Sequence, residues 1–420
     1  MELVAPLVRW RITGALFCAQ AFYSAAGIAS FTVASIIGAE LGGSAIFAGV
    51  PAAMLYVGRG VSAYPIGIIM DRAGRRPAIA LAYLIGAFGA ALATLSVLIE
   101  SYALFVVAAL IFGMARGGSD QSRFAAAEVH AEGRRARVIG LIVFSGTIGA
   151  IAGPLLVSLS ERFTVAVDIS WLAGPWIVAA VFSLFSSSII LGLVRPDPLQ
   201  ILRSSDRRRR LGSGAPARKG RGHVVMSIVR SPRARLAISS MMIGQVVMAM
   251  IMTMTPLYMN EGGQGTSAIS FAMLSHTVGM FGLAWMTGWL VDRFSPIPIM
   301  VAGAFMLITT GLLAAIADSF AVTMAVMFLL GLGWNFTFVS GSSLLVQGLA
   351  PSERGRTQGV GDAFVSVTAA TGGLGSGLMF AWGGMELLGW MGLALAAALV
   401  TGAFWVGVGR QPLAAAADGS

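Results

Sequence analysis

The chain has 420 residues, of which 57% are hydrophobic and only 11% are charged, and its mean hydropathy is +0.83. A soluble protein of this length needs far more polar residues to cover its surface, so these values exclude an ordinary soluble globular fold. Apolar runs of about 18 or more residues recur along the whole chain, and each is long enough to cross a bilayer as a helix. The composition therefore predicts a membrane protein with many spans.

Twelve apolar segments follow one another. The first could be a secretory signal, because Arg9 and Arg11 precede it, but its apolar run exceeds the roughly 7–15 residues of a signal core. We therefore expect it to be the first span, with Cys18 buried inside it as packing. Continuous apolar runs predict helices and exclude a β-barrel. The expected spans are 12–37, 44–70, 78–99, 102–127, 137–160, 172–194, 236–259, 268–291, 297–317, 320–348, 358–382 and 387–408.

The longest hydrophilic stretch, 195–235, separates six spans from six and carries twelve basic and two acidic residues. A nucleic-acid interface is one interpretation of such a run. The favoured one is a cytoplasmic linker against anionic lipid headgroups, with Ser204 to Gly222 disordered. The sequence thus predicts a first bundle over 1–194, the linker, and a second bundle over 236–420.

Charge predicts the orientation of the spans. If the N-terminus is cytoplasmic, the inner loops carry nearly all the arginines and the outer loops carry acidic residues, with Arg162 as their only basic residue. Positive charge marks the cytoplasmic side. We therefore expect both termini in the cytoplasm and the protein in the inner, or plasma, membrane.

A charged motif interrupts the apolar sequence between the second and third segments. This motif, "GIIMDRAGRRP" (67–77), is echoed by "GWLVDRFSPIP" (288–298), and the equivalent residues lie 221 positions apart. The same shift maps "EGRRARVIG" (132–140) onto "ERGRTQGVG" (353–361). The repeat predicts two parallel six-helix halves with pseudo-symmetry.

The first motif resembles the signature of the major facilitator superfamily between helices two and three. The resemblance covers essentially the whole chain and implies alternating access, a substrate site between the halves near the bilayer midplane, and a monomer. It also implies a cytoplasmic gate in which the aspartate pairs with arginines and with a helix N-terminus of the other half; the alternative is a charged anchor for a short loop. The matching residues are Gly67, Asp71, Arg72, Gly74, Arg75 and Arg76, with Asp292 and Arg293 as a weaker second copy.

The fifth segment contains "GTIGAIAGP" (146–154). Its Gly149, Gly153 and Pro154 resemble a pattern of proton-driven exporters in the same superfamily, although the trailing glycine pair is absent. Ordinary small-residue packing with a proline kink explains the pattern equally well. If the exporter resemblance holds, these three residues form a hinge in the fifth helix.

Ionisable residues inside a membrane helix are costly and commonly functional. The fourth segment holds Arg116, Asp120 and Arg123, whose spacing places them on one helical face. The arginines favour the ionised form of Asp120, which would take up a proton when a substrate displaces one of them. A static ion triad that fixes helix packing is the alternative.

Further candidates are distributed over other segments. Arg59 either completes the cationic cluster or extends toward the membrane surface, and His276 either titrates or is a hydrogen-bonded packing residue. Neutral candidates for lining the cavity are Gln20, Tyr23, Gln245, Trp334 and Asn335.

Together these patterns predict a secondary transporter that exports a small organic solute in exchange for protons. Proton symport uptake and uncoupled facilitation are the alternatives within this class, and a non-transporting membrane scaffold is the alternative outside it. We expect no enzymatic activity, cofactor, metal site or nucleic-acid partner, because no nucleophile with a base, no metal-ligand spacing and no phosphate loop can be found.

Overall fold

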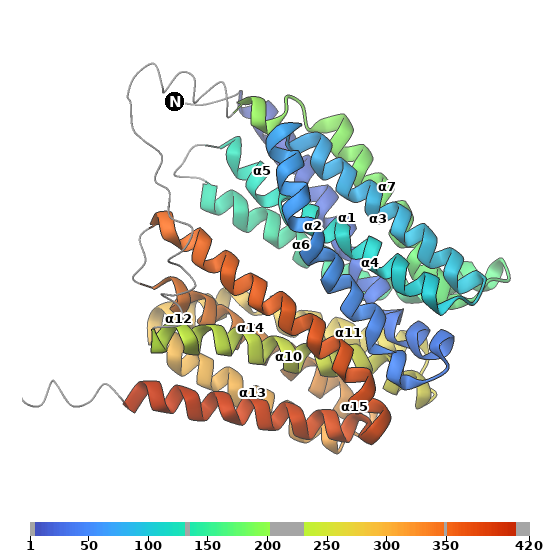
Figure 1. Cartoon of the computed structure of the whole chain (residues 1–420), viewed down its shortest axis with the longest axis vertical. Helices are drawn as coiled ribbons and strands as arrows, with labels where there is room; N and C mark the ends of the chain where they lie inside the picture. The colour runs from blue at the N-terminus through green and yellow to red at the C-terminus, as the bar shows by residue number, and fades with distance from the viewer. Residues whose placement is uncertain (1–4, 131–134, 202–230, 348–350, 409–420) are drawn as a thin grey trace, which may run out of the picture. The chain divides into compact units, whose positions relative to one another are not determined.

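The structure, a computed structural model, describes residues 5–130, 135–201, 231–347 and 351–408 (Figure 1). Within these ranges the regular elements are all helical. Up to residue 201 they are α1 (Pro6–Gly42), η1 (Ala45–Phe47), α2 (Gly49–Arg72), α3 (Arg75–Leu98), α4 (Tyr102–Ser119), α5 (Ser122–Glu128), α6 (Arg135–Ala166), η3 (Trp171–Ala173) and α7 (Gly174–Leu193). After residue 231 they are α10 (Pro232–Glu261), α11 (Thr266–Thr277), the π-helical η4 (Val278–Gly282), α12 (Ala284–Phe294), α13 (Pro296–Ala315), α14 (Phe320–Val346) and α15 (Pro351–Val408).

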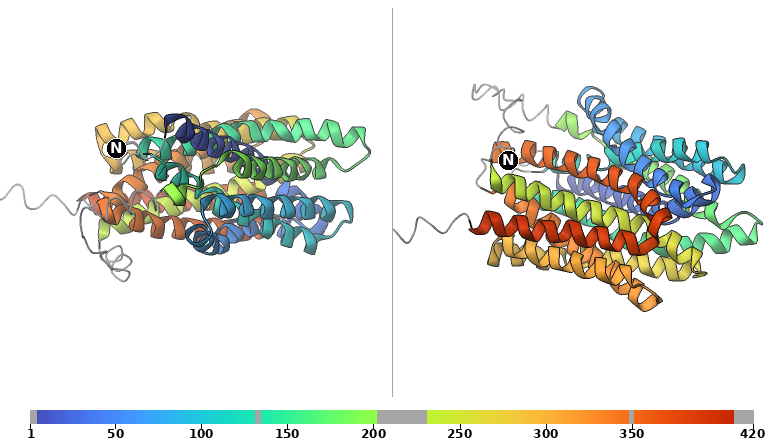
Figure 2. Two further views of the ribbon diagram at one scale, coloured as in Figure 1. Left: turned by 90° about the horizontal axis from the view of Figure 1, so that it is seen from above. Right: turned by 60° about the horizontal axis from the view of Figure 1, so that its bottom comes forward.

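The longest element, α15, has 58 residues and is broken at Gly383 and Gly384, whose backbone angles are not helical. Unbroken, it would extend for about 87 Å, nearly three times the hydrocarbon thickness. Figures 1 and 2 show that its two arms instead run antiparallel. In the described part of the chain, ten helices are long and apolar enough to span a membrane, and the pair α11–α12, bent by 41°, makes an eleventh. Counting the arms of α15 separately gives the twelve predicted spans and confirms the all-helical fold.

Contacts divide the chain into two compact units. The first comprises Met1–Arg218 and Met259–Leu274, and the second comprises Lys219–Tyr258 and Ser275–Ser420. The first unit thus includes the beginning of α11, which two hydroxyl contacts join to α6. Ser158 and Ser270 share a hydrogen bond of 3.1 Å, and Thr266 donates to the carboxylate of Glu161.

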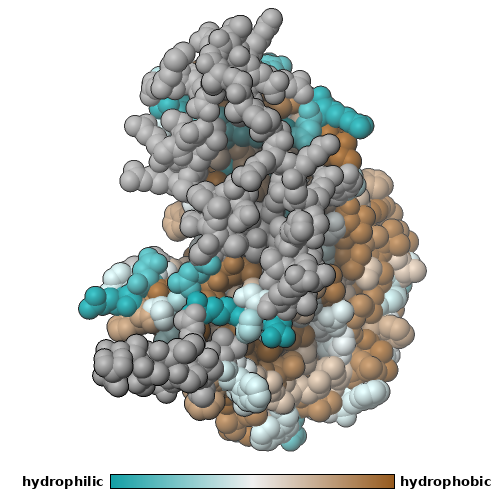
Figure 3. Space-filling model, turned by 60° about the vertical axis from the view of Figure 1, so that its left-hand side comes forward, coloured by the Kyte–Doolittle hydropathy of each residue, from teal (hydrophilic) through white to brown (hydrophobic). Residues whose placement is uncertain are grey.

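Inside the first unit, α1 packs against α6 and α7, α2 against α4, and α3 against α4 and α7. Its centre is aromatic: Trp176 meets Phe105 and Phe112 edge-on, and Phe112 lies against Tyr23. Large apolar side chains also remain exposed on the outside, and Figure 3 shows hydrophobic residues covering a broad face. An apolar exterior is what a bilayer solvates, so the exposed residues need no protein partner.

Several boundaries differ from those expected. α1 begins at Pro6 rather than residue 12, because proline suits the first turn of a helix and both arginines continue the helix. Cys18 is exposed rather than buried, on a face of α1 that its neighbours leave open. Residues 195–201 are ordered, α10 begins at Pro232, and the stretch from Ser204 to Gly222 lies outside the described residues.

The internal repeat is visible as an equivalent helix contact, but the expected constant shift is wrong. A Cβ atom on Gly58 would lie 2.1 Å from the carbonyl oxygen of Leu110, and one on Gly279 would lie 2.3 Å from that of Phe328. The glycines are 221 positions apart, whereas the contacted residues are 218 apart. The reason is that α13 has 20 residues where α3 has 24, while the loop after α13 is one residue longer than the loop after α3. In space, therefore, Trp334 corresponds to Arg116 and Phe338 to Asp120.

Candidate functional site

Close backbone packing of α2 and α4 positions the main charged cluster. A side chain on Gly113 would lie 2.3 Å from the carbonyl oxygen of Leu55, and one on Gly117 would lie 2.3 Å from the hydroxyl of Ser62. Ser62 adds a 2.7 Å hydrogen bond to the carbonyl of Met114. Only glycine allows this approach, which brings the side chains of α2 alongside those at the end of α4.

Asp120 is held by two arginines. Its Oδ2 lies 2.8 Å from a terminal nitrogen of Arg59 on α2, and its Oδ1 lies 3.3 Å from Nε of Arg116, one turn earlier on α4. The side chain of Asp120 is 22% exposed and those of Arg59 and Arg116 are each 38% exposed, so the cluster is accessible. Two cations against one anion leave an excess of one positive charge. The arrangement can accept an anionic group. Arg59 belongs to the cluster and does not extend separately toward the membrane surface.

Arg123 is not part of this contact. The helix tightens at Asp120, where the amide of Gln121 bonds to the carbonyl of Gly118, and α5 begins at Ser122. The guanidinium of Arg123 lies 4.9 Å from the ring centre of Phe124, and among the described residues its Nε has no hydrogen-bond partner. A continuous helix was expected here, and its interruption explains why Arg123 does not pair directly with Asp120.

Two neutral candidates on α1 lie beside the cluster. Gln20 accepts a hydrogen bond from Ser119, the residue before Asp120, and Tyr23 donates to the carbonyl of Phe112 at 3.2 Å. Both side chains are buried. Their present role is to attach α1 to α4 at the level of the cluster.

In the second unit, His276 is fully buried where α11 touches α14. Its Nδ1 donates to the carbonyl of Met327 at 3.1 Å, and its Nε2 has no partner within the described ranges. A side chain on Gly331 would lie 2.2 Å from the carbonyl oxygen of His276 itself, so the two backbones are in contact. His276 is therefore held in place by one hydrogen bond, and its second ring nitrogen has no partner among the described residues.

The remaining candidates also lie in the second unit, around α14. Asn335 donates to the carbonyl of Met280 at 2.6 Å and accepts from the hydroxyl of Thr287. Trp334 donates from Nε1 to Oε1 of Gln245 at 3.0 Å. The hydrogen bonds of Asn335 thereby connect α14 to η4 and α12, and the hydrogen bond of Trp334 connects α14 to α10.

The signature motif between α2 and α3 builds a network centred on Arg75. Its guanidinium makes two parallel bonds to Glu128, at 2.9 and 2.7 Å, and further bonds to Asp71 at 2.8 Å and to the carbonyl of Met70 at 2.7 Å. Asp71 is 77% exposed, so it is the outer partner. Gly67 faces open space, and Arg72 is exposed.

The start of α3 is capped by a residue from the stretch after α7. Asp197 accepts from the amides of Arg75, at 3.1 Å, and Arg76, at 2.9 Å. Gly74 makes this possible: its φ is +115°, and a side chain there would lie 2.5 Å from the carboxylate. Arg76 in turn donates to the carbonyl of Leu191 at 3.1 and 2.6 Å. The motif therefore binds α3 to both α5 and the end of α7.

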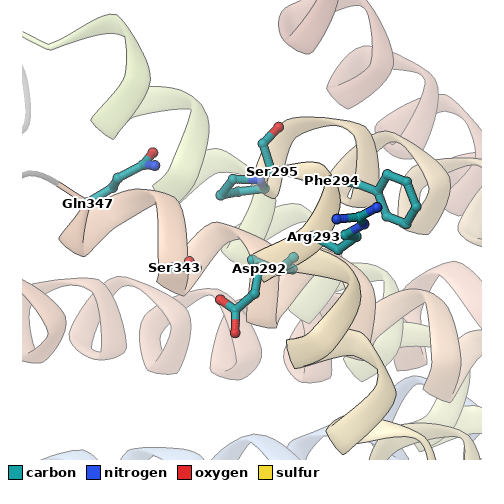
Figure 4. Close-up of a pocket in the computed structure, with 8 residues that line it drawn as sticks. Asp292, Arg293, Phe294, Ser295, Ser343 and Gln347 are labelled. Atoms are coloured by element: carbon teal, nitrogen blue, oxygen red, sulfur yellow. The ribbon is translucent and has the colours of Figure 1, made fainter.

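The second copy of the motif has a different form. Pro296 stands where the first copy has Arg75, and neither Asp292 nor Arg293 makes an ion pair in the described part of the chain. The two line a pocket of about 660 Å³ with Ser295, Ser343 and Gln347 (Figure 4).

The three residues expected to form a hinge in the fifth helix lie in α6. A side chain on Gly149 would lie 2.1 Å from the carbonyl oxygen of Ala21, and one on Gly153 would lie 2.7 Å from Cβ of Ile28. Pro154 is inside α6, and Ser24 donates to the carbonyl of Gly146 at 2.6 Å. These glycines allow α1 and α6 to pack closely.

Sequence reasoning missed Glu128 and Asp197. Glu128 ends the fourth span on the side of the membrane to which residues 71–76 also return, and that topology was the signal that could have revealed it. Asp197 was assigned to the linker, where nothing in its local sequence indicates a helix cap. Among the described residues, no group of three or more histidine, cysteine, aspartate and glutamate side chains could hold a metal ion.

Comparison with known proteins gives a consistent result. The family described as Major Facilitator Superfamily matches residues 15–361. The MFS-type transporter YddS of Bacillus subtilis is 32% identical, with 93% of this chain and 89% of the relative covered. The riboflavin transporter RfnT of Brucella anthropi is 25% identical, with 90% of each covered.

Solved transporters share the fold. The nucleoside transporter NupG superposes with a TM-score of 0.70 at 17% identity, covering 96% of this chain and 99% of that one. A bacterial homologue of the human lysosomal transporter Spinster, in an inward-facing conformation, gives a TM-score of 0.70 at 16% identity, covering 95% of this chain and 93% of that one.

Proposed function

Because this chain belongs to the major facilitator superfamily and is a membrane transporter, we propose that it moves a small organic solute by alternating access, coupled to protons. Export in exchange for protons is the direction we favour, because the pattern in α6 resembles that of proton-driven exporters. The protein would act as a monomer in the plasma membrane with both termini in the cytoplasm. Proton symport uptake and uncoupled facilitation are the competing modes.

The observation that carries this proposal is the cluster of Arg59, Asp120 and Arg116 inside membrane-spanning helices. An ionised group within a bilayer is energetically costly, so the few that occur there commonly have a function. An anionic part of a solute would bind the excess positive charge and compete with Asp120 for its arginines. A carboxylate that loses a cationic neighbour gains affinity for a proton. Solute binding and proton uptake would thereby be coupled at one side chain.

The Arg75 network would act as the cytoplasmic gate. It links α2, α3, α5 and the segment after α7 through charge-assisted bonds. Such bonds hold one arrangement of these helices and must be broken or moved as a group. The second copy of the motif, with Asp292 and Arg293, lacks an equivalent of Arg75 and would contribute less to this gate.

The test is solute-induced proton movement in proteoliposomes that contain an internal pH-sensitive dye. The panel should include riboflavin, because a 25% identical relative is named as its transporter. We expect a signal from the parent protein that disappears in Asp120→Asn. The matched control is Asp318→Asn, which makes the same change at an exposed loop residue. A signal that survives in Asp120→Asn would move the proton site elsewhere, and His276→Gln would be examined next.

The direction can be read from the same vesicles by imposing gradients of either sign. Solute accumulation driven by a proton gradient in the opposite direction indicates exchange, whereas accumulation in the same direction indicates symport. Solute movement without proton movement would support the uncoupled mode. Absence of any solute movement in folded, oriented protein would favour a non-transporting scaffold and lead to partner-capture experiments.

A further inference from the structure

Two aromatic rings on α14 form a stacked pair. The ring centres of Trp334 and Phe338 are 4.8 Å apart and their planes are inclined by only 15°. Phe281 of η4 stands at the edge of Trp334, with its ring centre at 6.2 Å and its plane inclined by 72°. All three side chains are half-buried rather than enclosed. We call these three residues the aromatic shelf.

The shelf lies on a different face of α14 from the one that packs on α13. The contacts with α13 are made through Gly333, Phe336 and Thr337, which approach Gly303 and Leu307. On a helix, positions 334 and 338 follow one another along one side, turned away from that direction. Trp334 is thus turned away from α13, whereas Phe338 also packs against the core cluster that contains Met300 and Ala304.

Gln245 provides an unused polar group beside the shelf. Indole Nε1 is only a donor, so the amide atom that it contacts at 3.0 Å must be the oxygen, and this fixes the amide orientation. The other amide atom, Nε2, has no hydrogen bond to any described residue; the residue as a whole is only 5% exposed, but this atom is not fully enclosed. A donor that is not enclosed and has no protein partner is available to an acceptor on a ligand.

The position of Phe281 is fixed by the neighbouring polar contacts. The π-helical segment that carries it is fastened by Asn335, which donates to the carbonyl of Met280 and accepts from Thr287. π-helical turns inside α-helices are rare and recur at functional sites. Asn335 is therefore a positioning residue for the shelf.

The repeat shows what the shelf replaces. Trp334 and Phe338 correspond to Arg116 and Asp120, which form the ion cluster of the first unit. One unit thus presents charges and the other presents stacked rings at equivalent places. A ring pair with one amide donor selects for flat, polarisable groups rather than for charge.

We propose that the aromatic shelf and Nε2 of Gln245 bind a planar heteroaromatic ring that bears a carbonyl oxygen, and that this ring is part of the transported solute. The ring stacks on Trp334 and Phe338, and its carbonyl accepts from Gln245. The inference rests on the proposed transport function and adds the chemical class of the substrate.

Equilibrium binding to the full-length protein in lipid nanodiscs tests the inference. The probes are riboflavin and uridine, which carry ring carbonyls, phenazine, a flat heteroaromatic without one, and ribitol, which has no ring. We expect the ring compounds to bind and ribitol not to bind. Trp334→Ala should weaken riboflavin binding about tenfold or more, as removal of a stacking partner does. Trp382→Ala, at a residue 73% exposed, is the matched control and should leave binding unchanged.

A second variant tests the donor separately. Gln245→Glu keeps an oxygen for Trp334 and removes the Nε2 donor, so it should weaken riboflavin and uridine but not phenazine. If Trp334→Ala does not fold, Phe338→Leu removes one ring without touching the hydrogen bond and should again weaken all three ring compounds.

Two outcomes overturn the inference: none of the ring compounds binds, or riboflavin binds equally to the parent, Trp334→Ala and Phe338→Leu. Failure of the proposed transport function is recognised separately, because it appears as absence of solute movement in proteoliposomes. Suppose that a solute without such a ring moves with protons in the parent protein but not in Asp120→Asn. The transport function would then be supported, and the ligand assigned to the aromatic shelf would be wrong.

Discussion

The guanidinium of Arg75 and the carboxylate of Glu128 face each other through two parallel hydrogen bonds of 2.9 and 2.7 Å, across 53 residues of sequence. Both side chains are largely buried, at 11% and 19% exposure, so water competes weakly for these bonds. Paired bonds between ionised groups are the strongest ordinary hydrogen bonds in proteins. This contact is therefore the main connection between α3 and α5.

Changing Glu128 should weaken the first unit. Glu128→Gln keeps one acceptor but places an amide donor opposite a guanidinium donor, so we expect a loss of about 1.5–3 kcal/mol of unfolding free energy. The measurement is unfolding in detergent followed by circular dichroism. Asp318→Asn makes a comparable change in an exposed loop and should have little effect. Equal stability of the two variants would contradict this role of Glu128.

The cap of α3 can be tested at Asp197. Asp197→Ala removes the acceptor for the amides of Arg75 and Arg76, and loss of such a cap costs about 0.5–2 kcal/mol. Asp197→Asn retains an oxygen acceptor and should lose less. The comparison is a pair of thermal unfolding curves. If Asp197→Asn destabilised as much as Asp197→Ala, the charge rather than the cap would matter.

Exchanging glycine and serine at equivalent positions of the two motif copies should change stability in opposite directions. Ser295 has φ +71° and Gly74, at the equivalent place, has φ +115°. Only glycine adopts this region without strain, which costs a non-glycine residue about 1–3 kcal/mol. Ser295→Gly should therefore raise the unfolding temperature, whereas Gly74→Ser should lower it. A destabilised Ser295→Gly would show that the serine side chain makes a compensating contact.

The approach of α2 to α4 should be essential for the ion cluster. In Gly113→Ala the new methyl group would lie 2.3 Å from the carbonyl oxygen of Leu55, so the helices must separate and Arg59 must move away from Asp120. Overpacking of this kind costs about 1–3 kcal/mol. The proteoliposome proton signal should fall together with stability. Gly60→Ala, in α2 with no atom within 4 Å, is the control and should retain both.

Much of the fold could be predicted from the sequence because a bilayer imposes a simple rule on apolar length. The expected spans 78–99, 172–194 and 320–348 agree closely with α3, α7 and α14. The rule contains no information on local breaks. It did not reveal the π-helical turn before α12, which is stabilised by Asn335 from another helix, and it did not distinguish the three-residue difference between the repeats.

The candidate site could be predicted where it depends on helical spacing and not where it depends on packing. The pair Arg116 and Asp120 follows from a separation of four residues on one helix. The contact of Arg59 with Asp120 requires α2 and α4 to touch, and the glycines that permit it are not distinguishable in sequence from the other glycines of the chain. Asp197 was missed for the same reason, since its partners lie more than 120 residues away.

Gly58 and Gly279 make the same backbone approach in the two units. If the halves arose by duplication and fusion of one gene, this approach was inherited twice, while Arg116 in one copy and Trp334 in the other show that the adjoining side chains have diverged. The residues that pack the helices together are then largely distinct from those that we propose bind the solute. A scaffold with that division can acquire a new substrate by point mutation without having to evolve a new fold.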